Sequence, residues 1–175
     1  MRLTRDVFDE CRERALSLLD RRAHSVGQLR AKLLKRGFAE ALVTLVTDDL
    51  FRTGLLDDQQ FAVAFCEERL QGSNPAGRRR LKAELLRRQV SAELAEEALS
   101  AVLDDAGADS EYASALAAGR RKWSALRARP GSDPRLDRDR LLRFLAGRGF
   151  SAEIGYRVAA AVASGAGAAD VTAAE

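Results

Sequence analysis

Residues 54–62 read Gly54-Leu55-Leu56-Asp57-Asp58-Gln59-Gln60-Phe61-Ala62, a sequence typical of one helix end followed at once by a helix start. Gly54 can adopt the left-handed conformation that ends a helix, because it has no Cβ to clash. Leu55 follows at the position whose side chain usually packs back on the last turn, here on Leu50. Asp57 can then cap the next helix by accepting a backbone N–H. These residues predict a tight joint between two helices.

The same segment carries two further start signals. Gln60 lies at the capping-box position after Asp57, and Leu56 with Phe61 has the spacing of a hydrophobic staple. Asp57 and Asp58 could also be read as a carboxylate pair that holds a metal ion. Capping explains Asp57, however, and the helix dipole favours an acid in the first turn. We therefore predict no metal site here, but a structural joint made by Gly54, Leu55, Leu56, Asp57, Gln60 and Phe61.

The composition favours a folded helical chain. The 175 residues are rich in Ala, Leu, Arg and Glu, contain only 3 Pro, and are 46% apolar and 31% charged. Cys11 and Cys66 are far apart and form no CxxC motif, so neither a disulfide framework nor a zinc site is predicted. Cys66 is expected to be a buried, inert thiol. No signal peptide or long apolar run is present, which predicts a cytoplasmic protein with no membrane partner.

Apolar residues at helical spacing predict nine helices. They cover about residues 6–19, 25–36, 40–52, 57–71, 78–88, 91–104, 109–127, 137–148 and 151–163. Ser25 and Gln28 have the capping-box spacing at the start of the second helix. Gly37 should end that helix, with Phe38 packed back on Leu33.

One pattern occurs three times along the chain. Leu29-Leu33-Leu34-Gly37-Phe38 matches Leu81-Leu85-Leu86-Gln89-Val90 and Leu141-Leu145-Ala146-Gly149-Phe150. Each copy is followed at one spacing by the expected first buried residue of the next helix, which is Leu42, Leu94 or Ile154. Gln89 replaces glycine in the second copy, which predicts a less well formed helix end there.

The repetition predicts an all-α fold, an elongated array of three tandem three-helix repeats in which each repeat buries its end against the next. The predicted repeats cover residues 1–53, 54–106 and 107–164. Residues 165–175 have no core-forming pattern and are expected to be a disordered tail.

Charge follows the same repeat, although the whole chain carries a net charge of only +3. Residues 21–36 contain six basic residues and no acid, and residues 69–90 contain seven basic residues and one acid. Residues 91–111, in contrast, contain seven acids and no basic residue. Such segregation would place the cations of the array on one face and the acids on another.

Exposed Lys and Arg are usually only a solvated surface. Here, however, Arg78-Arg79-Arg80 opens a helix, where the macrodipole disfavours cations, which suggests that an anionic partner compensates. Phosphate contacts would give sequence-independent, salt-sensitive binding. The predicted partner-binding and DNA-binding residues are Arg21, Arg22, Arg30, Lys32, Lys35, Arg36, Arg78, Arg79, Arg80, Lys82, Arg87, Arg88, Arg120, Arg121 and Lys122.

Other functions find less support in the sequence. His24 is the only histidine, is expected in a solvent-exposed turn and has no nucleophilic partner nearby, so no catalytic residue is predicted. No GxxxxGK[ST] or GxGxxG motif is present, and no cofactor is expected. The middle helices lack an Asn or Gln set suited to base edges, which argues against sequence-specific DNA reading. A partner protein of complementary charge is a further possibility.

Several segments together resemble the RecX family of regulatory proteins. The resemblance begins at Ala15-Leu16-Ser17-Leu18-Leu19 and is most specific at Gly54-Leu55-Leu56-Asp57-Asp58 and Gly77-Arg78-Arg79-Arg80-Leu81. Arg148-Gly149-Phe150-Ser151 is similar to the family's C-terminal signature. The departures are His24 where arginine is common, Gln28 in place of an acid, and Gln89-Val90 in place of Gly-Ile.

This resemblance implies a non-enzymatic regulator of the RecA recombinase, and we expect the chain to be a monomer. Such a protein would bind the RecA nucleoprotein filament and dampen its ATPase, strand exchange and co-protease activity in DNA repair and the SOS response. It would bind DNA weakly and without sequence preference. The alternative from another class is a sequence-nonspecific DNA-binding protein that acts without RecA.

Overall fold

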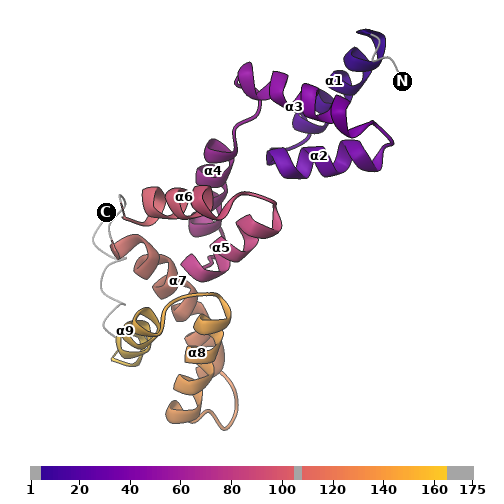
Figure 1. Cartoon of the computed structure of the whole chain (residues 1–175). Coiled ribbons are helices and arrows are strands. Elements are labelled where there is room, and N and C mark those ends of the chain that lie inside the picture. The colour runs from indigo at the N-terminus through magenta and orange to yellow at the C-terminus, as the bar shows by residue number, and fades with distance from the viewer. Residues whose placement is uncertain (1–4, 105–107, 165–175) are drawn as a thin grey trace, which may run out of the picture. The chain divides into compact units, whose positions relative to one another are not determined.

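The computed structural model describes residues 5–104 and 108–164, and within these ranges the regular structure consists of nine α-helices and no strand (Figure 1). The helices are α1 (Arg5–Leu19), α2 (Val26–Lys35), α3 (Glu40–Arg52), α4 (Asp58–Gln71), α5 (Arg78–Arg87), α6 (Ala92–Asp104), α7 (Ala108–Arg127), α8 (Pro134–Gly147) and α9 (Ala152–Ala163). The predicted all-α class is confirmed. The predicted tail, residues 165–175, lies outside the described residues.

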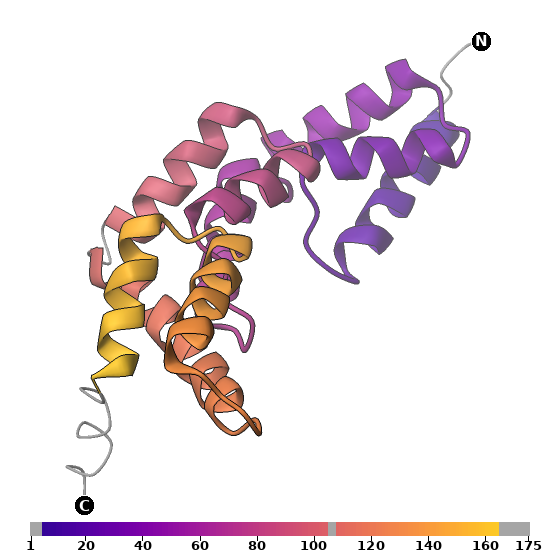
Figure 2. The same ribbon diagram turned by 90° about the horizontal axis from the view of Figure 1, so that it is seen from below.

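The chain divides into two compact units. The first contains residues 5–65 and 84–98, and the second contains residues 66–83 and the described residues from 99 onward. In the first unit α1, α2 and α3 pack on one another, and in the second unit α7, α8 and α9 do the same (Figure 2). Each three-helix bundle has its own apolar core.

Leucines of the middle helices form the centre of these cores. Leu29 and Leu33 of α2 are fully buried together with Leu42, Val43 and Leu50 of α3. In the second unit Leu141 and Leu145 of α8 are fully buried against Val158 and Ala159 of α9. Burying a leucine side chain stabilises a fold by about 1.5–3 kcal/mol, so these positions account for much of each bundle's stability.

The threefold pattern is confirmed by the backbone as well as by burial. The equivalent residues Leu81 and Leu85 of α5 are also fully buried. Each middle helix ends in a left-handed residue, with φ of +90° at Gly37, +62° at Gln89 and +87° at Gly149. The three repeats therefore share one helix-ending turn.

Two predictions about this pattern are wrong in detail. The end of α5 is fully formed despite Gln89, whose N–H donates to Leu86 O at 2.9 Å, while the N–H of Val90 donates to Leu85 O at 3.2 Å. The turn therefore imposes a left-handed conformation that a residue other than glycine rarely adopts. In the third helices, Leu94 and Ile154 are only half-buried, and the first buried residues are Ala95 and Gly155.

The joint at residues 54–62 ends α3 with both hydrogen bonds of a Schellman motif. Gly54, with φ of +71°, donates its N–H to Phe51 O at 3.0 Å, and Leu55 donates its N–H to Leu50 O at 2.9 Å. The prediction that the Leu55 side chain packs back is wrong, because that side chain is 51% exposed. Leu56 is the buried leucine, 3% exposed and part of the core of the first bundle.

Asp57 caps α4 as predicted, since its Oδ1 accepts the N–H of Gln59 at 2.8 Å and that of Gln60 at 3.0 Å. Gln60 is exposed, and its reciprocal bond stays a prediction. Phe61 is half-buried and stacks on Phe65 with ring centroids 6.4 Å apart.

Replacing this cap is expected to cost a moderate amount of stability. Asp57→Ala leaves two backbone N–H groups without their carboxylate and should lower the free energy of unfolding by about 0.5–2 kcal/mol. A urea titration followed by circular dichroism measures this change. An unchanged urea midpoint would show that water satisfies these N–H groups equally well.

Helix α8 begins earlier than the predicted residue 137. Asp133 caps it by accepting the N–H of Arg135 at 2.8 Å, and Pro134 occupies the first helical position, where a missing N–H costs nothing. Asp137 therefore lies within the helix and is fully buried. Its carboxylate accepts the Ser132 hydroxyl at 2.5 Å and Arg140 Nη1 at 2.8 Å, and these hydrogen bonds, followed by the nearby arginines, lower its pKa.

Candidate functional site

The first candidate surface is a basic cleft between the end of α1 and the C-terminal half of α2, here named the α2 cleft. It has a volume of about 730 Å³ and is lined by Leu18, Arg21, Arg22, His24, Lys32, Lys35 and Arg36. Five of these side chains are cations and none is an acid. The structure thus brings five of the six basic residues predicted in this segment together.

Local structure explains the convergence. Helix α1 ends at Leu19, so Arg21 and Arg22 lie in the turn before Ser25, which caps α2 through its capping box with Gln28. Lys32, Lys35 and Arg36 follow at the spacing that places side chains on one helix face. The sixth predicted residue, Arg30, lies elsewhere and donates from Nη2 to Thr44 Oγ1 at 2.9 Å.

The positive charges in the cleft favour the binding of an anion. Partial burial lowers the pKa of the Lys32 ammonium, and the charges of Arg22, Arg36 and Arg21 lower it further. The neighbouring positive charges thus destabilise the charged form of Lys32, and a bound anion would relieve this repulsion.

His24 is buried in the wall of this cleft, so its predicted solvent exposure is wrong. It is 3% exposed, its Nδ1 lies 2.8 Å from Arg22 O, and its Nε2 lies 2.6 Å from Lys32 Nζ. An ammonium can only donate, so these contacts assign a neutral ring that accepts at Nε2 and donates from Nδ1. Burial is the main reason why the His24 pKa lies below its usual 6.5.

His24 should make stability depend on pH in the slightly acidic range. Because its folded-state pKa is lowered, the unfolded chain binds a proton near pH 6.5 that the folded chain does not bind. The stability that the neutral His24 ring contributes is thus present above about pH 6.5, and it is lost as the pH falls toward the folded-state pKa. Urea midpoints should fall more between about pH 7.5 and 5.5 for the wild type than for His24→Asn. Parallel curves for the two proteins would contradict this assignment.

The second candidate surface, in the second unit, surrounds the loop of residues 72–77. Three guanidinium groups from three elements donate to consecutive carbonyls of this loop: Arg121 Nη2 to Ser73 O at 3.0 Å, Arg69 Nη1 to Asn74 O at 3.3 Å, and Arg148 Nη1 to Pro75 O at 3.3 Å. Arg80 completes a group that we name the arginine cluster: Arg69, Arg80, Arg121 and Arg148.

The arginine cluster concentrates positive charge. Burial lowers the pKa of Arg148, and the neighbouring charges of Arg80, Arg69 and Arg121 lower it further. Arg148 also lies over the Phe144 ring at 4.8 Å from its centroid, and Lys122 Nζ lies 5.5 Å from the same centroid. An anion at this surface would meet cations from four elements.

Sequence reasoning missed Arg69 and Arg148 as site residues, because both lie outside the basic middle helices. Arg69 is in the last turn of α4, and Arg148 caps the end of α8. For Arg148 the available signal was the segment Arg148-Gly149-Phe150-Ser151, which is similar to the family's C-terminal signature. Of the other predicted residues, Arg87 and Arg120 are exposed, while Arg88 lies 4.2 Å over the Phe65 ring.

The run Arg78-Arg79-Arg80 is divided between two surfaces. Arg78 and Arg79 line a separate cleft of about 490 Å³ with Lys82 and Glu111. Glu111 Oε1 accepts the backbone N–H of Arg78 at 2.9 Å, and the Arg78 guanidinium donates to Ser100 Oγ at 3.1 Å. Glu111 thus supplies a carboxylate of the same chain at the start of α5, and an external anion at these arginines stays a prediction.

The acids of the joint bind backbone groups. Asp58 Oδ1 accepts the N–H of Val26 at 2.7 Å, and burial is the main reason why its pKa is raised. In the part of the chain that the structure describes, no three His, Cys, Asp or Glu side chains are grouped as metal ligands. Cys66 is buried as predicted, and burial raises its pKa to about 11, so it stays a thiol at neutral pH. None of the described helices has the length and apolar character needed to cross a membrane.

Comparison with known proteins agrees with the three repeats. Models of the first, second and third three-helix domains of RecX match residues 11–50, 57–99 and 109–158. A regulatory protein RecX from Mycobacterium sp. (strain KMS) is 38% identical over 136 residues, which are 78% of this chain and 72% of that protein. The RecX from Thermobifida fusca is 33% identical over 153 residues, 87% of this chain and 78% of that protein.

Solved structures show the same fold. The crystal structure of RecX from Lactobacillus salivarius superposes with a TM-score of 0.78 at 16% identity and covers 92% of this chain and 99% of that one. Three tandem domain matches that span more than half of the chain, together with these relatives, establish its membership. The chain belongs to the RecX family of regulatory proteins.

Proposed function

We propose that this chain is a non-enzymatic regulator of the RecA recombinase that binds the RecA–DNA filament and dampens its ATPase, strand exchange and co-protease activity. Membership of a family of regulatory proteins supports a regulatory role. The observation that carries the proposal is the presence of two separate cation-rich surfaces, the α2 cleft and the arginine cluster. A nucleoprotein filament offers DNA phosphates together with a protein surface.

The chemistry of these surfaces favours contact with backbone phosphates. Guanidinium and ammonium groups bind phosphate oxygens without reading base identity. The α2 cleft combines five such groups with one neutral histidine. We therefore expect weak, salt-sensitive DNA binding without sequence preference, strengthened where a filament holds DNA and protein together.

The direct test is the ATPase activity of RecA on single-stranded DNA with the full-length chain titrated in. We expect inhibition that increases with concentration and is complete near stoichiometric amounts. ATP hydrolysis by the chain alone is the control, with no activity expected. Unchanged RecA turnover at several-fold molar excess would overturn the proposal.

The second candidate is a sequence-nonspecific DNA-binding protein that acts without RecA, and the same two surfaces support it. Fluorescence anisotropy with labelled DNA over a salt series distinguishes the two functions. Tight, steeply salt-dependent binding combined with no effect on RecA would favour the second candidate. Weak binding combined with strong inhibition would favour the first.

A further inference from the structure

One type of contact between consecutive repeats occurs within the first unit. The start of α2 lies on the turn between α5 and α6, where the Ser25 hydroxyl donates to Arg88 O. The N–H of Val26 donates to Asp58 Oδ1 at 2.7 Å. The approach is close, because a Cβ added at Gly27 would lie 2.4 Å from Gln89 Cβ.

The second unit repeats this contact with equivalent residues. The start of α5 lies on the turn between α8 and α9, where Gly77 N–H donates to Arg148 O at 3.0 Å. The N–H of Arg78 donates to Glu111 Oε1 at 2.9 Å. A Cβ added at Gly149 would lie 2.5 Å from Arg80 Cβ. In both units, therefore, a helix-ending turn and a nearby carboxylate receive the N-terminus of the preceding middle helix.

The first repeat contains a third copy of the receiving turn, at Arg36–Gly37. Gly37 is exposed, and among the described residues no atom would lie within 4 Å of a Cβ added there. Phe38 is only half-buried, whereas the equivalent Val90 and Phe150 are each 3% exposed. This copy of the turn is therefore uncovered in the described structure.

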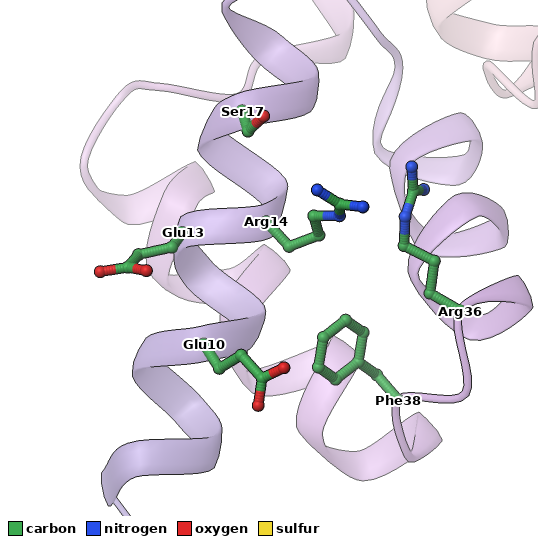
Figure 3. A pocket seen from close by; sticks show the side chains of 6 residues that line it. All are labelled: Glu10, Glu13, Arg14, Ser17, Arg36 and Phe38. Atoms are coloured by element: carbon green, nitrogen blue, oxygen red, sulfur yellow. The ribbon is translucent and has the colours of Figure 1, made fainter.

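A pocket of about 530 Å³ lies beside this turn and is lined by Glu10, Glu13, Arg14, Ser17, Arg36 and Phe38. Figure 3 shows the Glu10 carboxylate next to the Phe38 ring, while the Glu13 carboxylate points away from that ring. Glu10 thus offers the first repeat a carboxylate near its turn, as Asp58 and Glu111 do in the other two. The pocket and the turn together form a surface that we name the α1–α2 socket.

A second copy of this chain is not suited to fill the socket. The helix that would extend the array is α8, and its start differs from those of α2 and α5. Its first residue, Pro134, has no N–H to donate, and Asp133 already caps it. The residue aligned with Gly77 is Asp137, which is buried inside α8. The start of α8 in one copy of this chain therefore cannot make the same contact with the socket of a second copy.

We propose that the α1–α2 socket binds the N-terminus of a helix from a different protein, with a small N-cap residue such as Ser or Gly, as Ser25 and Gly77 are in the two intact contacts. The Arg36 carbonyl would accept from the N-cap residue, and Glu10 would accept a first-turn N–H. The helix dipole favours a carboxylate at this place. This inference goes beyond the proposed DNA-binding surfaces and does not depend on them.

The test is a nuclear magnetic resonance titration of the full-length 15N-labelled chain. The probe is a helical Ala/Glu/Lys-rich peptide of about 20 residues that begins with the residues of 25–28, Ser-Val-Gly-Gln. The control peptide begins Leu-Val-Gly-Gln, because the Ser25 hydroxyl donates to the turn in one intact contact and Gly77 lies against the turn backbone in the other. We expect saturable shifts at the amides of Arg36, Gly37 and Phe38, with at least about fivefold weaker binding of the control peptide.

Two variants of the protein test the carboxylate. Glu10→Gln should weaken binding of the probe peptide about threefold or more, while Asp48→Asn, at an exposed residue of α3 outside the pocket lining, should leave its affinity unchanged. Three outcomes would overturn the proposal: no saturable shift up to about 2 mM peptide, equal affinity for both peptides, or shifts at these amides that depend on protein concentration without peptide. The last result would identify a second copy as the occupant.

Discussion

Reversing two charges in the α2 cleft is expected to reduce DNA affinity by about 10- to 100-fold at moderate salt. The variant is Arg21→Glu with Lys35→Glu, both exposed residues that line the cleft. Each change removes a cation near phosphate and adds a repelling carboxylate. The slope of log K against log salt should become less steep by about 2, close to one unit for each lost phosphate contact. Anisotropy with labelled DNA measures both quantities.

A matched control separates local contacts from net charge. Arg135→Glu with Arg138→Glu changes the net charge by the same amount on exposed residues of α8, outside the α2 cleft and the arginine cluster. An acid near the start of a helix is favoured by its dipole, so this control should fold. We expect its DNA affinity to change by less than about threefold. Equal losses in both variants would show that total charge, rather than the α2 cleft, determines binding.

If the α2 cleft contacts the filament, a variant that loses DNA affinity should also lose inhibition of RecA. The cleft variant should then require a correspondingly higher concentration to inhibit RecA ATPase, with an unchanged helical circular-dichroism signal. Full inhibition by this variant would place the filament contact elsewhere and would leave the arginine cluster as the candidate.

Local patterns in the sequence predicted most of the fold. Each middle helix buries one face and ends in a left-handed turn. The sequence therefore repeats a buried leucine at 29, 81 and 141 and a turn residue at 37, 89 and 149. Caps at Ser25, Asp57 and Ser151 depend only on neighbouring residues. Such features can be read from a sequence, since their causes lie within a few positions of the chain.

Contacts between distant residues explain the errors. The sequence around His24 resembles an exposed turn, and only the fold places Lys32 beside its ring. No local signal in the sequence indicates that Glu111 accepts the N–H of Arg78. The arginine cluster also requires tertiary structure, since Arg69 and Arg148 meet only at the loop of residues 72–77. The sequence indicated the cations of the α2 cleft, but only Arg80 and Arg121 of the arginine cluster.

Gly77→Ala is expected to lower the free energy of unfolding by about 3 kcal/mol, one of the largest effects of a single methyl group in this chain. A Cβ at residue 77 would lie 2.6 Å from the carbonyl carbon and oxygen of Gly149 and from Phe150 Cα. These are backbone atoms, which cannot rotate away as a side chain could. The new methyl group must therefore separate the start of α5 from the α8–α9 turn and stretch the 3.0 Å bond from Gly77 N–H to Arg148 O.

Gly147→Ala is the matched control, because this exposed glycine at the end of α8 has no described atom within 4 Å of an added Cβ. Alanine is the better helix former, so this change should leave stability unchanged or raise it by up to about 1 kcal/mol. Urea midpoints of the two variants measure the difference. In Gly77→Ala, the separation of the start of α5 from the α8–α9 turn should also displace Arg148 from the loop of residues 72–77. We therefore expect weaker DNA binding through the arginine cluster. A Gly77→Ala protein as stable as the Gly147→Ala control would show that this contact opens without cost, and the contact could not then be what holds the two repeats together.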